Sequence, residues 1–273
     1  MIVKAIYRYP IKSCGGEKLQ QAKLDKLGIQ GDRRWMLIDP NNRMVTQRQC
    51  AKMCLIQVKT SNKNQPGLVV NSPGFQALFI QQPASQNTIE VQVWQDKCQA
   101  WLADETAHQW FSNVLGRAVR LVWFPDTSQR QIDLNYAQIG EQLAFADGFP
   151  LLLTNQASLD DLNQRLAEPI EMIRFRPNIV INTGCAFEED QHAEVMIGEH
   201  CFKIAKPCAR CIIPTVDPFT AQAQLEVRSA LSYRKQGNDI LFGQNLLYSN
   251  SLRLRLQVSL VELACSDAVS WKA

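Results

Sequence analysis

The sequence contains only three histidines in 273 residues. His108 falls in a predicted helix, His192 in an acidic loop and His200 at a predicted hairpin. A histidine-based metal centre or a serine-type catalytic triad therefore lacks convincing members. The sequence also has no GxxxxGK motif followed by serine or threonine, and no glycine-rich dinucleotide fingerprint after a strand. The common nucleotide-binding signatures are thus missing.

Dense clusters of positive charge are absent as well. The chain has 29 basic and 26 acidic residues and a net charge of +3, so we do not expect nucleic-acid binding. Lys4 and Arg8 interrupt the first apolar run, and no later run is long enough to cross a bilayer. We therefore expect a cytoplasmic protein without a membrane partner.

Cysteine, in contrast, is abundant. The nine cysteines are an odd number with uneven spacing, in a chain long enough to fold without disulfides, so most are expected to be reduced. Cys208 and Cys211 stand apart because they flank Arg210 in a loop bounded by prolines, within residues 206–218. This loop combines a soft ligand, a redox group and an anion-binding group, and chemistry is most expected there.

Alternation of apolar and polar residues predicts that strands form most of the core. It is clearest at residues 88–93, 202–204 and 253–258. Hairpins are expected over residues 35–46, where a proline-containing turn lies in the middle, and around Gly198.

Two helices are predicted. The first covers residues 107–115, with Asp104 as its N-terminal cap and Gly116 at its end. The second is expected to start at Ser158, with two aspartates in its first turn. Residues 62–87 are rich in Asn, Gln, Ser, Pro and Gly and are expected to form turns and loops between strands.

The predicted fold class is α+β, mainly β. The length favours two domains over one, and polar turn residues at 123–129 suggest the boundary. We expect a strand-rich N-terminal domain over residues 1–122 and a second domain over residues 123–273, which carries the two-cysteine loop.

The spacing of Cys208 and Cys211 allows three chemistries: half of a zinc site, a dithiol redox pair, or a thiolate ligand for a softer metal centre. Zinc needs further ligands, and Cys50 and Cys54 form the other close pair. A redox pair favours a strand-to-helix junction, whereas the Ile-Ile-Pro sequence after Cys211 is expected to be extended. If the cysteines only pack in a turn, Arg210 points to solvent. The spacing alone leaves these alternatives open.

Basic residues at other strand ends suggest an anion-binding site. Lys12 and Ser13, followed by two glycines, come at the end of the first predicted strand. Further arginines flank the first hairpin or precede an apolar strand: Arg33, Arg34, Arg48, Arg174 and Arg176. Singly, each is more often a solvated side chain, just as Asp217 before Pro218 is more often a turn residue.

Six short motifs follow one another in order: YPIKS at 9–13, GDRRW at 31–35, TQRQ at 46–49, FRPN at 175–178, CARC at 208–211 and TVDP at 215–218. Together they resemble the MOSC (molybdenum cofactor sulfurase C-terminal) family, and most of all its amidoxime-reducing subgroup. The resemblance implies a β-barrel MOSC domain packed with an N-terminal β-barrel-like domain. It also implies a bound molybdenum–molybdopterin cofactor.

In that subgroup the second cysteine of the loop binds molybdenum. The resemblance therefore implies that Cys211 is the metal ligand, that Arg210 beside it is a catalytic, charge-stabilising group, and that Cys208 is only a neighbour. It further implies cofactor contacts from both halves of the chain. These are Lys12, Ser13, Arg33, Asp147, Gly148, Phe149, Arg176, Asn178, Ala209, Arg210 and Cys211.

The implied reaction is the reduction of N-hydroxylated compounds, such as amidoximes, hydroxylamines or N-hydroxylated base analogues, to amines or amidines. Longer bacterial relatives append a domain with an iron–sulfur cluster, but here only Cys265 follows the terminal strand region. Electrons are therefore expected from a separate ferredoxin-like protein or flavin reductase. The alternative is a cofactor carrier or sulfur-transfer protein that reduces no substrate. The segment 252–263 departs from the family pattern because it lacks glycine, so its strand pairing is open.

Overall fold

The computed structural model describes residues 1–61, 65–84, 87–249, 252, 256 and 261–272. Strands dominate this part of the chain and helices are few, so the predicted α+β, mainly β class is confirmed. None of the helices within these residues is long and apolar enough to cross a membrane.

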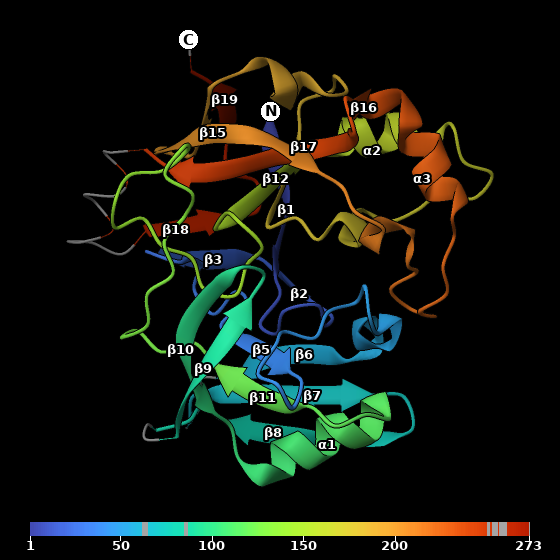
Figure 1. Cartoon of the computed structure of the whole chain (residues 1–273). Coiled ribbons are helices and arrows are strands. Elements are labelled where there is room, and N and C mark those ends of the chain that lie inside the picture. The colour runs from blue at the N-terminus through green and yellow to red at the C-terminus, as the bar shows by residue number, and fades with distance from the viewer. Residues whose placement is uncertain (62–64, 85–86, 250–251, 253–255, 257–260, 273) are drawn as a thin grey trace.

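The largest sheet takes strands from both ends of the chain. Within the described residues its nine strands are β1 (Ile2–Arg8), β2 (Glu17–Leu19), β12 (Leu151–Asn155), β13 (Ile179–Asn182), β14 (Glu194–Ile197), β15 (His200–Ala209), β16 (Lys235–Gln236), β17 (Asp239–Tyr248) and β19 (Val269–Trp271). They follow the order β19-β14-β15-β17-β12-β13-β1-β2, with β16 on β17. This sheet forms the upper part of Figure 1.

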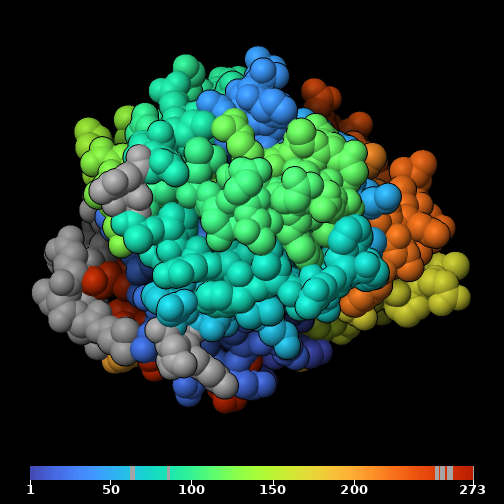
Figure 2. All heavy atoms as spheres, turned by 90° about the horizontal axis from the view of Figure 1, so that it is seen from below, coloured from blue at the N-terminus to red at the C-terminus, as the bar shows by residue number. Residues whose placement is uncertain are grey.

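Three smaller sheets complete the structure. Their members are β5 (Trp35–Ile38), β9 (Thr88–Val93), β10 (Asp96–Leu102) and β11 (Arg120–Trp123) in one sheet, β6 (Gln57–Ser61), β7 (Gly67–Ser72) and β8 (Phe75–Gln81) in another, and β3 (Gln21–Asp25), β4 (Gly28–Ile29) and β18 (Val261–Ala264) in the third. The first two lie in the lower part of Figure 1, and Figure 2 shows the cyan and green side chains of this region covering the face seen from below.

The first predicted helix is confirmed. In α1 (Glu105–Leu115) the Asp104 carboxylate accepts a hydrogen bond from the Ala107 amide, and Gly116 ends the helix in the left-handed conformation. The buried side chains of α1, including Phe111, belong to an apolar cluster beneath β6, β7 and β11.

The predicted start of the second helix was wrong. Helix α2 (Gln156–Asn163) begins directly after β12, because the Asn155 side chain accepts a hydrogen bond from the Ala157 amide and so caps the helix. The two aspartates therefore lie beyond the first turn. A further helix, α3 (Glu226–Ala230), follows the two-cysteine loop.

Residues 62–87 were expected to form turns and loops, and this was wrong for most of the described part. Here β7 and β8 pair as a hairpin. Leu68, Val70 and Ser72 point inward and are buried, while polar Asn71 lies on the exposed face. Burial thus alternates with period two along β7, as in a strand with one face packed on the core.

Both predicted hairpins are present. Asp39 and Arg43 close the first turn, where the Asp39 amide donates to the Arg43 carbonyl at 2.9 Å. Strands β14 and β15 form the second, with Gly198 in a left-handed conformation at the turn. Of the strand predicted at 253–258, all but Leu256 lies outside the described residues, and Leu256 is helical, so the prediction was wrong at this residue.

Strands from the N-terminal third pair directly with strands from the C-terminal half. β1 lies against β13, and β3 lies against β18. Fully buried Ile6, Ile179 and Phe202 share one apolar cluster. The domain boundary at residue 122 stays a prediction, but the two segments that it separates form joint sheets. This arrangement brings the predicted anion-binding loops next to the two-cysteine loop.

Candidate functional site

The two-cysteine loop begins at the end of a long strand. Strand β15 extends to Ala209, and the Arg210 amide then donates to the Ile240 carbonyl at 2.7 Å. After Cys211 the chain turns into a 3₁₀ helix, Ile213–Thr215, so the expected extended conformation of this segment was wrong. A proline at the start of that turn is compatible with helical geometry. Cys211 is half-buried and is not joined to Cys208.

Arg210 is held in place rather than directed to solvent. One terminal nitrogen donates to the Cys208 sulfur at 3.0 Å, and the other donates to the Phe175 carbonyl at 2.7 Å. Its Nε atom is buried and has no hydrogen-bond partner among the described residues. Arg210 therefore fixes the loop and keeps one buried donor available.

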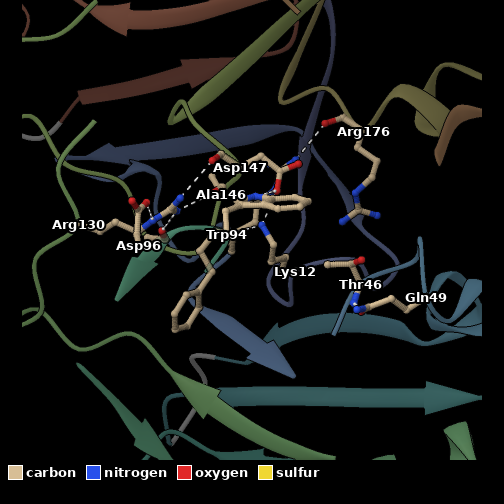
Figure 3. A network of polar contacts seen from close by, with 12 residues as sticks. Lys12, Thr46, Gln49, Trp94, Asp96, Arg130, Ala146, Asp147 and Arg176 are labelled. Atoms are coloured by element: carbon tan, nitrogen blue, oxygen red, sulfur yellow. Dashed lines mark hydrogen bonds and ion pairs between the residues drawn. The ribbon is translucent and has the colours of Figure 1, made fainter. Parts of the chain in front are cut away.

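Lys12 is almost fully buried, with 4% of its surface exposed. Its ammonium donates to the Phe145 carbonyl and to the Asp147 carboxylate, both at 2.6 Å. Burial lowers the pKa of Lys12, although the Asp147 carboxylate opposes this effect. Figure 3 shows Lys12 directed towards Asp147, with Trp94 beside it.

The Asp147 carboxylate forms an ion pair with Lys12. Partial desolvation of the carboxylate works against its ionisation, but the Lys12 ammonium and the Arg48 guanidinium outweigh it, so the pKa of Asp147 lies below its usual range. The Trp94 indole also donates to this carboxylate at 3.1 Å. Because 60% of the Asp147 side chain is exposed, solvent screens the ion pair.

A second group of contacts joins the two halves of the chain. Arg33 donates to the Asn178 side-chain oxygen at 3.0 Å and to the Arg176 carbonyl at 3.1 Å. Arg176 in turn donates to the Cys14 carbonyl at 2.6 Å. The guanidinium carbons of Arg33 and Arg176 lie 4.5 and 4.3 Å from the ring centroid of buried Tyr9. The Tyr9 ring thus supports two positive charges at once.

Three of the candidate residues have an uncommon backbone conformation. The φ angles of Ser13, Arg33 and Arg176 are 68°, 46° and 55°. This left-handed region is costly for residues other than glycine and is enriched at ligand-binding sites. Its occurrence at three residues of one site indicates that the fold holds these side chains and amides in a defined geometry.

One pocket collects all of the predicted site residues. Its lining includes Lys12, Ser13, Arg33, Asp147, Gly148, Phe149, Arg176, Asn178, Ala209, Arg210 and Cys211. Thus the structure brings together loops more than 190 positions apart in the chain, from residue 12 to residue 211. The basic strand ends and the thiol belong to the same site.

Other residues of this region were not predicted. Phe175 and Asn245 also line the pocket. Buried Arg130 donates to the carbonyls of Ala146, at 2.5 Å, and Asp147, at 3.1 Å, and so anchors the loop that holds Lys12. Arg130 also pairs with the Asp96 carboxylate at 2.8 Å, but it carries no local signal in the sequence, since its contacts with this loop are to backbone atoms.

The zinc alternative loses support. All nine cysteines and three histidines lie in the described part of the chain, where no three His, Cys, Asp or Glu side chains gather as a metal-binding group. A zinc site built from the Cys50 and Cys54 pair is therefore not formed. Asp217 is a turn residue, as expected, because its carboxylate accepts from the Phe219 amide, and it also pairs with Arg174 at 2.7 Å.

The sequence matches two family models. The MOSC N-terminal beta barrel domain matches residues 1–118, and the MOSC domain matches residues 140–258. The chain belongs to the MOSC family. This confirms the resemblance inferred from the six motifs.

Two human MOSC relatives are similar over most of the chain. Mitochondrial amidoxime reducing component 2 is 35% identical over 80% of this chain and 67% of its own length. Mitochondrial amidoxime-reducing component 1 is 30% identical over 91% of this chain and 79% of its own. The bovine molybdenum cofactor sulfurase is 27% identical over 91% of this chain but only 30% of its own length. The names of these MOSC relatives link the family to molybdenum cofactor and to amidoxime reduction.

Proposed function

We propose that this MOSC protein binds molybdenum cofactor in the candidate site and reduces N-hydroxylated compounds to amines or amidines. One observation carries the proposal: a half-buried thiol, Cys211, and a group of buried or half-buried cations line the same pocket. The similarity to two amidoxime-reducing components supports the reaction class.

The residues present fit such a cofactor. A single protein thiolate suits a metal whose other sulfur ligands come from the cofactor itself, and a phosphate group suits a cradle of lysine, hydroxyl and guanidinium donors. Lys12, Ser13 and Arg33 supply these donors. The buried, unpaired Nε of Arg210 is a further donor that a bound group would satisfy.

When bound, the cofactor would supply a metal centre that exchanges two electrons and accepts an oxygen atom. The overall change consumes two electrons and two protons, breaks the N–O bond and releases water. Cys211 would hold the metal, and Lys12 would bind the phosphate while Asp147 keeps its ammonium oriented. Arg210, fixed by the Phe175 carbonyl, would stabilise negative charge that develops close to Cys211.

The first test is metal and pterin content. The chain is expressed in a host that makes molybdenum cofactor, as the wild type and as the Cys211→Ala and Cys208→Ala variants. We expect Cys211→Ala to lose most of its molybdenum and Cys208→Ala to keep it, because only Cys211 is proposed as the ligand. Bound zinc without pterin in the wild type would contradict the proposal.

The second test separates an enzyme from a carrier. Loaded protein is incubated anaerobically with benzamidoxime and a chemical reductant, and benzamidine is measured. We expect turnover in the wild type and none in Cys211→Ala. A fully loaded wild type without turnover would instead favour a cofactor carrier or sulfur-transfer protein, the function suggested by the similarity to molybdenum cofactor sulfurase.

The electron donor is proposed to be a separate ferredoxin-like protein or flavin reductase. Replacing the chemical reductant by a reduced ferredoxin or by a flavin reductase with its pyridine nucleotide tests this step. If neither protein supports turnover, the proposed electron donor is wrong.

A further inference from the structure

A second, smaller pocket adjoins the candidate site. The two pockets share Arg176 and Ile213. Its other walls come from the 3₁₀ helix Met172–Phe175, the chain after Cys211, and the N-terminal half, and they are Gly15, Gly16, Gln47, Cys54, Gln57, Ile173, Arg174, Val216, Pro218 and Phe219. None of the predicted site residues except Arg176 lines it.

Two guanidinium groups in this pocket have unused donors. Arg174 is 6% exposed; one terminal nitrogen pairs with Asp217 at 2.7 Å, and the other, Nη1, is buried without a partner. Arg176 likewise has a buried Nη2 atom without a partner among the described residues. An unsatisfied buried donor on a charged group is costly, and both guanidiniums belong to residues that line this pocket, so an acceptor bound there would offset that cost.

The walls of the pocket leave its charge positive. No acidic residue occurs among the described residues that line it. Burial raises the pKa of the Cys54 thiol to about 11, so this wall is neutral at physiological pH. The carboxylates that act on the two guanidiniums, Asp217, Glu171 and Glu226 on Arg174 and Asp32 on Arg176, all belong to residues outside the lining. An anion is therefore the complementary ligand.

The shape and surroundings favour a carboxylate. Ile173, Ile213, Val216 and Phe219 provide apolar walls, which suit the hydrocarbon part of an organic acid better than a fully hydrated ion. A planar carboxylate also matches the geometry of guanidinium donors.

We propose that this pocket is a carboxylate subsite, in which Arg174 and Arg176 bind the acid group of a substrate whose N-hydroxylated end lies towards Cys211. The substrate part rests on the proposed function, whereas carboxylate binding does not. The protein would then prefer N-hydroxylated compounds that carry a carboxylate over neutral ones.

Binding is tested without turnover. Acetate is titrated into the purified protein at constant ionic strength, with neutral acetamide as the reference compound, and thermal stability and heat of binding are recorded. We expect acetate alone to stabilise the wild type. In Arg174→Lys the charge and the pairing with Asp217 are retained but the second donor is lost, so acetate should bind about tenfold or more weakly.

Arg165→Lys is the matched control, because Arg165 is an exposed arginine that also pairs with an aspartate, Asp161. It should respond to acetate like the wild type. If acetate binding weakens equally in both variants, or does not weaken in Arg174→Lys, the proposed subsite is wrong. Loss of pterin in Arg174→Lys would also overturn it, since the pocket would then belong to the cofactor.

Substrate preference is tested on loaded protein with benzamidoxime and its meta- and para-carboxy derivatives. We expect kcat/KM for at least one carboxylated compound to exceed that for benzamidoxime about tenfold, mainly through KM, and Arg174→Lys to remove the difference while leaving benzamidoxime reduction unchanged. An equal preference in wild type and variant would refute the substrate assignment. If no compound turns over, the proposed function fails, and the acetate titration still decides whether the subsite binds carboxylates.

Discussion

Replacing Tyr9 tests how the arginines of the candidate site are held together. The ring is fully buried, and the guanidinium carbons of Arg33 and Arg176 lie within 4.5 Å of its centroid. For partly desolvated pairs a cation–π contact contributes about 1 kcal/mol, so two contribute roughly 2 kcal/mol. Tyr9→Leu loses both and leaves a void worth about 1–2 kcal/mol more. We expect a loss of about 3–4 kcal/mol in unfolding free energy.

The matched variant is Tyr9→Phe, which keeps the ring. The Tyr9 hydroxyl is buried without a hydrogen-bond partner among the described residues, so removing it should change the stability by less than about 1 kcal/mol. Urea unfolding, followed by tryptophan fluorescence and circular dichroism, measures both variants. The reasoning is refuted if Tyr9→Phe is as destabilised as Tyr9→Leu, because the hydroxyl and not the ring would then hold the site.

Three further predictions concern other parts of the molecule. Since Lys12 lowers the pKa of Asp147, the ionised carboxylate stabilises the fold above its unfolded pKa of 3.8. Asp147→Asn should therefore lower the unfolding free energy by about 1 kcal/mol near neutral pH. In urea unfolding, this difference from the wild type should shrink as the pH falls below 3.8. Burial raises the pKa of the Cys14 thiol to about 12, so iodoacetamide at pH 8 should label exposed Cys185 but not Cys14 in the native protein. Peptide mass mapping measures the labelling, and equal labelling of the two cysteines would contradict the prediction. Gly243 has a φ of 78°, and a Cβ atom there would lie 2.6 Å from the Leu153 carbonyl oxygen. Gly243→Ala should therefore lower the unfolding free energy by more than about 2 kcal/mol. An unchanged midpoint of urea denaturation would rule out this clash.

Local signals in the sequence predict single elements well. The cap at Asp104 and the left-handed glycine at 116 define α1 because both act within a few residues of the helix end. Composition is a weaker guide: residues 62–87 look like loops, yet β7 buries Leu68 and Val70 on one face and exposes Val69 and Asn71 on the other. Local sequence patterns do not predict the pairing partners of β1 and β3, because these partners lie in the C-terminal half of the chain.

The same distinction applies to the candidate site. Motif resemblance predicts the residues that line the pocket, and the structure brings them together, but their roles in binding stay predictions. Arg130 could not have been found in this way, because it acts through backbone carbonyls of residues 144–147, which any side chain can provide. Trp94, whose indole donates to Asp147, stands at a turn in a left-handed conformation that is uncommon for a large aromatic residue, so its place at the site follows from the tertiary structure.

The pairing of β3 with β18 has a consequence for how the chain acquires its structure. Strand β3 leaves the ribosome long before its partner β18 is made, since Leu24 pairs with Val261. Contacts so distant in sequence form slowly and late. The edge of β3 that pairs with β18 is therefore exposed during synthesis, when chaperone binding would protect it. Arg33 likewise reaches its contacts with Arg176 and Asn178 only after that segment has been made.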